Sequence, residues 1–214
     1  MIYKAAIFDM DGTLINTLED LADSVNEMLA HYNRPPRTLD EVRMFVGNGA
    51  RILMQRALES TDENFINDAL KFYDGCYKRR LTNKTKPYAG IVELLTALQN
   101  KNIPVAICTN KQHFAAVALA EKIFPTIKFT AVIGDAQKPN PARALEIMEK
   151  IGVAPAEVAY FGDTAVDMKT AVNAGFLPIG VTWGFRAENE LVASGAKFII
   201  HSADEIFNLI EFGG

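Results

Sequence analysis

Four short apolar runs of this sequence each end in polar residues that could do chemistry. In chain order these residues are Asp9 and Asp11, then Thr109 and Asn110, then Lys138, and finally Asp163 and Asp167. In an open parallel sheet, ligands bind beyond the carboxyl ends of the strands. If the apolar runs are parallel strands, we expect these side chains to converge on one crevice.

The residue types in this set predict phosphoryl transfer assisted by Mg²⁺. Carboxylates packed together repel one another and need a cation, and oxygen donors without histidine or cysteine suit Mg²⁺. An ionised Asp9 could attack a phosphoryl group, while Asp11 could move a proton from two residues away. Lys138 and the hydroxyl of Thr109 could stabilise the charge of the transferring group.

Each residue also has a purely structural explanation, and the residue pattern alone leaves both open. Asp9–Gly12 could be an Asx turn at the end of a strand, and Thr109 could simply favour a strand. Lys138 could be a solvated loop residue. Asp167 could cap a helix that begins near Thr164.

Short apolar runs alternate with helical patterns over most of the chain. We predict strands at Ala5–Phe8, Val105–Cys108, Phe129–Ile133, Val158–Phe161, Pro178–Trp183 and Phe198–Ile200. Their continuous apolar character indicates strands buried on both faces. We predict helices at Ile91–Asn100, Phe114–Lys122, Pro141–Ile151, Asp167–Ala174, Ala187–Ser194 and Ala203–Ile210. The alternation predicts an α/β fold with a doubly wound parallel sheet.

One stretch breaks this alternation and predicts an inserted helical subdomain. From Ile15 to about Asn83 no run resembles a buried strand. Helical spacing occurs instead at Leu18–Tyr32, Leu39–Phe45, Ala50–Leu58 and Glu63–Arg80. We expect residues 15–83 to form this subdomain and residues 1–14 and 84–214 to form the α/β core, with an exit hinge near Thr82–Pro87.

Composition narrows the class of protein. The 214 residues are 49% hydrophobic and 22% charged, which rules out wholesale disorder. A net charge of −4 argues against binding to nucleic acid or to an anionic membrane surface. Cys76 and Cys108 belong to no zinc-type cluster, so we expect free thiols. Met1–Phe8 does not read as a signal peptide and no run is long enough to span a membrane, so a cytoplasmic protein is expected.

Taken in order, the polar strand ends resemble the motifs of the haloacid dehalogenase superfamily. The segments that carry the resemblance are Phe8–Leu14, Thr109–Asn110, Lys138–Pro139, and Gly162–Asp163 with Asp167. Four further segments are similar to the phosphoglycolate phosphatase group within it: Leu21–Leu29, Val46–Gly49, Thr109–Lys111 and Gly180–Gly184. The resemblance implies a Rossmann-like core with an inserted helical cap of type C1.

The resemblance also implies a phosphomonoester hydrolase with an aspartyl-phosphate intermediate. In that family Asp9 would be the nucleophile, and Asp11 would protonate the leaving alkoxide and then activate water. Mg²⁺ would be bound by Asp9, Asp163 and the backbone carbonyl of Asp11. Asp167 would support the water shell of the metal or orient Lys138. Dehalogenases lack the second aspartate, so its presence favours phosphate chemistry.

The phosphate-binding residues implied by the resemblance are Thr109, Asn110 and Lys138. Between Val132 and Lys138 the chain has fewer residues than such relatives usually have. The shorter loop could still deliver Lys138, because a lysine stem is long and flexible. It could also leave Lys138 out of reach, with Lys111 as a weaker substitute.

The substrate implied is a small phosphorylated metabolite, with 2-phosphoglycolate as the first candidate. A pyrophosphatase or nucleotidase with the same core remains an alternative. A sugar-phosphate mutase is a further one, but such enzymes carry a cap histidine ten residues beyond the second aspartate, and Leu21 stands there. The sequence gives no oligomeric state.

A turn in the helical subdomain is a candidate for substrate selection. Gly47, Asn48 and Gly49 precede a helix, and Arg51 lies just inside it. Backbone N–H groups at a helix start favour an anion, and an arginine can bind a carboxylate with two hydrogen bonds. The alternative is an ordinary helix–helix turn with Arg51 in solvent.

Overall fold

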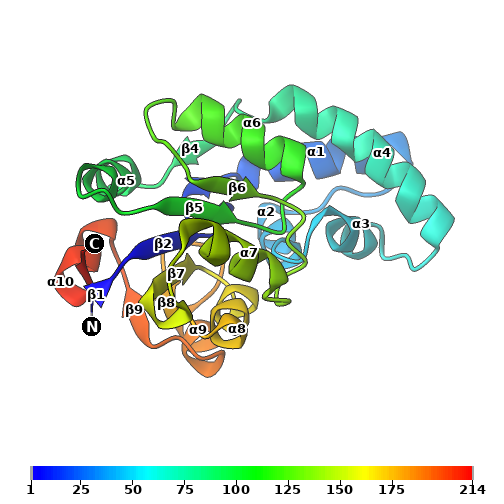
Figure 1. Cartoon of the computed structure of the whole chain (residues 1–214). Coiled ribbons are helices and arrows are strands. Elements are labelled where there is room, and N and C mark those ends of the chain that lie inside the picture. Colours follow the sequence, from blue (N-terminus) through cyan, green and yellow to red (C-terminus); the bar gives the residue numbers. More distant parts are fainter. Residues whose placement is uncertain (1, 214) are drawn as a thin grey trace.

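A six-stranded parallel sheet lies at the centre of the computed structural model, which describes residues 2–213 (Figure 1). From edge to edge its strands are β6 (Ala131–Ile133), β5 (Val105–Cys108), β2 (Ala5–Phe8), β7 (Val158–Gly162), β8 (Leu177–Val181) and β9 (Phe198–Ile200). Strand order runs outward in both directions from β2, so the sheet is doubly wound as the sequence predicts. The crevice of such a sheet lies where the order reverses, at the carboxyl ends of β2 and its neighbours.

Helices cover both faces of the sheet and create two apolar layers. On one face lie α5 (Ile91–Asn100), α6 (His113–Ile123) and α10 (Ile206–Leu209). The other face carries α7 (Ala142–Ile151), α8 (Ala165–Ala174) and α9 (Glu188–Ala193). Successive residues of β2 show the arrangement, because Ala6 and Phe8 join one layer while Ala5 and Ile7 join the other. Burial on both faces explains why this strand has no polar alternation.

Four helices between the first and second core strands form the inserted subdomain, which we call the cap. They are α1 (Leu18–His31), α2 (Leu39–Phe45), α3 (Ala50–Leu58) and α4 (Glu63–Arg80). The side chain of Thr38 accepts from the backbone N–H of Glu41 to start α2, and that of Asp62 accepts from two backbone N–H groups to start α4. Figure 1 shows the cap helices together at one end of the molecule. The predicted type of fold, an α/β core with an inserted helical cap, is confirmed.

The two connections between cap and core pair with each other. Strand β3 (Ile15–Asn16) enters the cap, β4 (Lys86–Pro87) leaves it, and the two are antiparallel neighbours. Asp20, buried in the first turn of α1, accepts hydrogen bonds from the backbone N–H groups of Lys84 and Thr85. The cap therefore begins and ends at one hydrogen-bonded crossing point.

Several element boundaries differ from the sequence predictions. The predicted strand Phe129–Ile133 begins only at Ala131, and Pro178–Trp183 is shifted to Leu177–Val181. The segment Ala203–Ile210 divides into a 3₁₀ turn, Ala203–Glu205, and α10. Four further short strands, β1 (Ile2–Tyr3), β3, β4 and β10 (Glu211–Phe212), were not predicted. Two-residue strands carry no periodicity, so their pairing depends on which segments meet in the fold.

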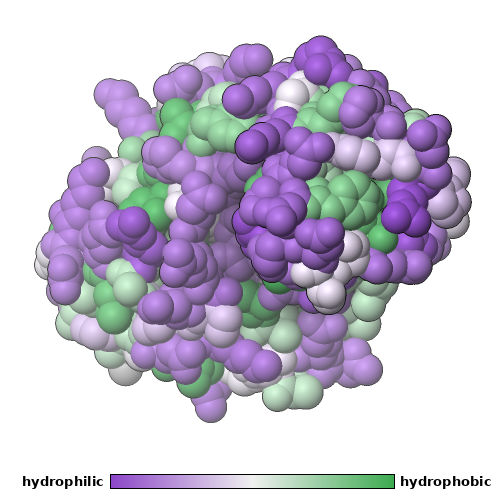
Figure 2. Space-filling view, turned by 90° about the vertical axis from the view of Figure 1, so that its right-hand side faces the viewer, coloured by the Kyte–Doolittle hydropathy of each residue, from purple (hydrophilic) through white to green (hydrophobic). Residues whose placement is uncertain are grey.

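The outer face of the molecule seen in Figure 2 is mainly hydrophilic, with apolar residues in small separate patches. Cys76 and Cys108 are buried free thiols, as expected. Within residues 2–213, no helix is both long and apolar enough to cross a membrane.

Candidate active site

The loop after β2 is a tight turn that presents Asp9 at the end of the strand. The backbone carbonyl of Met10 accepts hydrogen bonds from the N–H groups of Leu14 and Ile15, which closes the turn. Gly12 has a φ of 83°, and a Cβ at this position would lie 2.2 Å from Oδ2 of Asp163. Only glycine permits this backbone conformation beside a second strand end.

Three buried carboxylates and one lysine meet at this strand end. One carboxylate oxygen from each of Asp9, Asp163 and Asp167 lies within 4.8 Å of the others. Nζ of Lys138 lies 2.8 Å from Oδ1 of Asp9 and 2.6 Å from Oδ1 of Asp167. The lysine side chain is only 2% exposed. The short loop therefore does not leave Lys138 out of reach, because its Nζ contacts Asp9.

The loop delivers Lys138 by running along the end of β5. The N–H of Ala136 donates to the carbonyl of Thr109, and that of Asp135 donates to the carbonyl of Lys111. Asp135 and Gln137 take left-handed φ values of 52° and 57°. These reversals fold the chain back within a few residues, so the short loop still brings Lys138 to Asp9.

Asp167 is at the start of a helix, as considered from the sequence, and it also contacts Lys138. Its Oδ2 accepts from the N–H and the hydroxyl of Thr164 and caps α8. Its Oδ1 accepts from Lys138. The hydrogen bonds at the start of α8 thus fix the carboxylate of Asp167 in the position from which it contacts Lys138.

Burial dominates the electrostatics of this cluster. Burial, and then the charge of Asp167, raises the pKa of Asp9 to about 6. The same two causes raise the pKa of Asp163 well above its usual range. Burial works to lower the pKa of Lys138, but Asp167 and Asp9 hold it above its ordinary value. One lysine does not neutralise three carboxylates, so the ionised cluster has an excess of negative charge that a divalent cation would balance.

The donor set fits a hard divalent cation. All three clustered groups are carboxylates, with no sulfur or imidazole among them. Asp163 is held in place by the hydroxyl of Thr13 at 3.0 Å and by the N–H of Phe185 at 2.8 Å. Such outer partners orient the carboxylates of metal sites. The residues present are therefore suited to a divalent metal.

The carboxylate of Asp11 points away from this cluster and into the neighbouring cavity. Nζ of Lys111 lies 2.9 Å from its Oδ1 and 3.0 Å from its Oδ2, and the hydroxyl of Thr17 donates to it at 2.7 Å. If a metal contacts Asp11, the contact must therefore come from its backbone, as the resemblance implies.

Thr109 and Asn110 follow β5 but are used differently. Thr109 is 2% exposed and lines the cavity next to Asp9. The side chain of Asn110 accepts from the N–H of Lys138 at 2.7 Å, and it donates to the carbonyls of Lys138 and Gly47. Its side-chain amide thus ties the lysine loop and the cap turn together.

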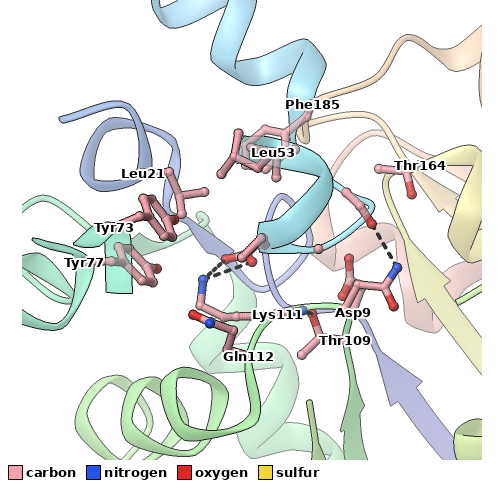
Figure 3. Close-up of a pocket in the computed structure, with 16 residues that line it drawn as sticks. Asp9, Leu21, Leu53, Tyr73, Tyr77, Thr109, Lys111, Gln112, Thr164 and Phe185 are labelled. Atoms are coloured by element: carbon pink, nitrogen blue, oxygen red, sulfur yellow. Dashed lines mark hydrogen bonds and ion pairs between the residues drawn. The ribbon is translucent and has the colours of Figure 1, made fainter. Parts of the chain in front are cut away.

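A cavity between core and cap contains Asp9 and Asp11 (Figure 3). The cap contributes an apolar wall, which consists of Leu21, Val46, Ala50, Leu53, Tyr73 and Tyr77. The cavity volume is about 50 Å³, which leaves room for a small compound.

The structure does not bring Asn48 and Arg51 into this cavity. Gly47 and Gly49 line it, but Asn48 is exposed and accepts from Arg56 at 3.0 Å. Arg51 forms an ion pair with Glu63 at 2.5 Å, and its side chain is 42% exposed. The expected grip of Arg51 on a substrate carboxylate therefore has no support in this geometry, since the guanidinium is held against α4 on the outer surface.

Sequence reasoning missed the aromatic part of the site and most of the role of Lys111. Tyr73 and Tyr77 lie in α4 with parallel rings whose centroids are 5.8 Å apart. Their spacing of four residues predicts a shared helix face. Nothing in the sequence says whether that face meets the core or the cavity.

Comparison with known proteins agrees with this fold. The family model described as haloacid dehalogenase-like hydrolase matches residues 6–181. A phosphoglycolate phosphatase from Agrobacterium fabrum is 37% identical over 84% of this chain and 81% of its own. One from Chromobacterium violaceum is 31% identical over 98% of this chain and 97% of its own. A solved structure described as a predicted phosphoglycolate phosphatase from Haemophilus somnus superposes with a TM-score of 0.90 at 27% identity, covering 97% of both chains.

The fold and site define a hydrolase with a capped α/β core and a carboxylate crevice. The chain belongs to the haloacid dehalogenase-like hydrolases. The expectation of a phosphatase of this type is confirmed, and its relatives include many named phosphoglycolate phosphatase.

Proposed function

We propose that this chain is a Mg²⁺-dependent phosphomonoester hydrolase that acts on small phosphorylated metabolites, with 2-phosphoglycolate as the leading candidate. The observation that carries the proposal is the contact of Lys138 with Asp9 inside a buried cluster that also contains Asp163 and Asp167. A carboxylate beside a fixed cation at a strand end is suited to attack a phosphoryl group whose charge that cation balances.

In the proposed reaction, an Asp9 oxygen attacks the phosphorus and the bond from phosphorus to the ester oxygen breaks. Asp11 gives its proton to the leaving alkoxide, which departs as an alcohol. Asp11 then takes a proton from water, whose oxygen attacks the phosphorus of the aspartyl-phosphate. This step releases inorganic phosphate and restores Asp9. Thr109 and Lys138 bind the phosphoryl oxygens throughout.

Asp9, Asp163 and the backbone carbonyl of Asp11 would bind Mg²⁺, with Asp167 in support. When bound, the ion would neutralise charge that develops on the phosphoryl group.

The cavity lies between core and cap and has an apolar wall on the cap side, which suits a small phosphorylated compound. Leu21 lines this cavity at the position where a sugar-phosphate mutase would have its histidine. The free cysteines agree with the proposed cytoplasmic location.

Phosphate release from a panel of compounds tests the proposal. The panel contains 2-phosphoglycolate, ethyl phosphate, p-nitrophenyl phosphate, a nucleoside monophosphate and pyrophosphate, each with Mg²⁺ and with EDTA. We expect Mg²⁺-dependent turnover, with 2-phosphoglycolate as the preferred substrate. Asp9→Asn should retain less than a few per cent of the wild-type turnover. Asp135→Asn is the matched control, because Asp135 is an exposed strand-end aspartate outside the cavity. Full activity in Asp9→Asn, or turnover independent of metal, would overturn the assignment.

A further inference from the structure

The hydroxyl of Tyr77 is a buried polar group without a partner. Tyr77 is 2% exposed, and no group among residues 2–213 forms a hydrogen bond with its oxygen. Burying a hydroxyl without a hydrogen bond is unfavourable, so such a group in a cavity wall indicates a ligand that supplies the partner. Burial raises the pKa of Tyr77 well above its usual value, which keeps the hydroxyl protonated and able to donate.

Lys111 lies directly beside the aromatic ring of Tyr77. Its Nζ is 4.6 Å from the centroid of the Tyr77 ring, and its side chain is 4% exposed. Figure 3 shows Tyr77 and Lys111 facing each other from the cap and the core. Among the described residues that line the cavity, Lys111 is the sole cation.

The position of Lys111 relative to Asp11 determines which part of a substrate it can meet. Both oxygens of Asp11 lie within 3.0 Å of Nζ of Lys111. If Asp11 protonates the ester oxygen, Lys111 is the cation nearest to the carbon atoms attached to that oxygen. An ammonium has three N–H donors, so it can bind a substrate oxygen while it still contacts Asp11.

We propose that Lys111 and the hydroxyl of Tyr77 together bind an anionic group on the leaving-group side of the substrate, most simply a carboxylate close to the ester oxygen. This inference rests on the proposed phosphatase function and specifies its substrate class. A carboxylate accepts several hydrogen bonds, and the site offers one charged donor from the core and one neutral donor from the cap. A cationic or purely apolar leaving group would leave the Tyr77 hydroxyl unpaired or would be repelled by Lys111. The cap thereby selects its substrate through α4 and not through Arg51.

The test compares two substrates that differ only in the carboxylate, 2-phosphoglycolate and ethyl phosphate. The measured quantity is the ratio of their kcat/KM values in the wild type, Tyr77→Phe and Lys111→Met. A hydrogen bond to a charged group corresponds to a loss of roughly tenfold to a hundredfold in this ratio for Tyr77→Phe. Lys111→Met is expected to lower the ratio at least as much. Because both substrates use Asp11, the ratio cancels any effect of Lys111 on that residue.

A second readout separates ligand binding from a structural role. Tyr77→Phe removes a hydroxyl that has no partner, so thermal stability without ligand is expected to stay equal or to rise. Binding of 2-phosphoglycolate to Asp9→Asn, which should not turn it over, is expected to weaken by a similar factor when Tyr77→Phe is added, as measured by calorimetry.

Two control variants match the chemistry of the changes. Lys78→Met removes an exposed lysine one residue beyond Tyr77, whose Nζ lies over the ring of Phe114 and outside the cavity. Tyr88→Phe removes a tyrosine hydroxyl that does not line the cavity. Both are expected to keep the wild-type ratio.

The outcomes distinguish this inference from the proposed function. If the wild type hydrolyses both esters equally well, the proposed carboxylate-bearing substrate is wrong, whatever the variants do. If the wild type prefers 2-phosphoglycolate and both Tyr77→Phe and Lys111→Met retain that preference, the phosphatase assignment stands and this inference is overturned. A stability loss in Tyr77→Phe without a change in the ratio would also overturn it.

Discussion

Replacing Lys138 by methionine would test how strongly the buried cluster depends on its one cation. The change keeps the length of the stem but removes contacts of 2.8 Å to Asp9 and 2.6 Å to Asp167. Three carboxylates then remain buried without a cationic partner. Breaking a buried pair by removing one partner costs about 3–5 kcal/mol. We expect the lower part of this range without metal, because the raised pKa of Asp9, about 6, allows the carboxyl group to take up a proton.

Thermal unfolding in EDTA measures the effect directly. For a chain of this size, 1 kcal/mol corresponds to about 2–4 °C, so a loss of about 3 kcal/mol in Lys138→Met should lower Tm by about 6–12 °C. Turnover of 2-phosphoglycolate should fall about 10²–10³-fold, as for the loss of a preorganised charge. Lys84→Met is the matched control, since Lys84 pairs with Asp23 at 2.8 Å but is 47% exposed. An exposed pair contributes up to about 1 kcal/mol, so its Tm should change little.

Two outcomes would contradict this role of Lys138. If Lys138→Met and Lys84→Met lowered Tm equally, burial of the cluster would not be what makes Lys138 important. If the stability loss appeared with turnover intact, Lys138 would stabilise the fold without touching the phosphoryl group.

Three further predictions concern the acid, the cap and the metal. Asp11→Asn should slow the first step more for an alkyl than for an aryl phosphate, by roughly 10²–10⁴-fold, because a poor leaving group needs a proton; equal losses in single-turnover assays would exclude Asp11 as the acid. Arg186 donates to the carbonyls of Arg43, Met44 and Val46 in the cap. Arg186→Ala should therefore raise KM for 2-phosphoglycolate and speed hydrogen exchange at the start of α3. Unchanged exchange would show that these bonds do not hold the cap against the core. Mg²⁺ should raise Tm more at pH 7.5 than at pH 5. The pKa of Asp9 is raised from 3.8 to about 6, so its contribution to stability is present below pH 3.8 and lost as the pH rises through 6, while the metal requires the ionised form; equal metal-induced shifts at both pH values would contradict this.

The sequence alone determined the architecture and the identity of the strand-end residues. Continuous apolar runs such as Ala5–Phe8 and Val158–Phe161 predicted strands buried on both faces, and the helical stretch after Ile15 predicted an insertion. Parallel strands have their carboxyl ends on one edge, so residues far apart in the chain were expected to meet there. Asp9 and Asp163 depend only on this rule, and the structure brings them together. The position of Lys138 depends in addition on how its loop folds back at Asp135 and Gln137.

The direction and the use of individual side chains were decided by the tertiary structure. Asp11 lies two residues from Asp9, yet its carboxylate faces Lys111 and the cavity. Arg51 follows a turn that does line the cavity, but a favourable ion pair with Glu63 holds its guanidinium on the outer surface. Sequence spacing gives the position of a side chain along a helix or after a strand, but its rotamer depends on the charges and space around it.

Tyr77 shows the same limit for the cap as a whole. Its place in α4 and its helix face follow from periodicity. Which cap face closes over the crevice depends on how four helices pack on one another and on the β3–β4 crossing point. Those contacts join residues far apart in the chain, so no local pattern contains them, and only the folded cap places the Tyr77 ring beside Lys111.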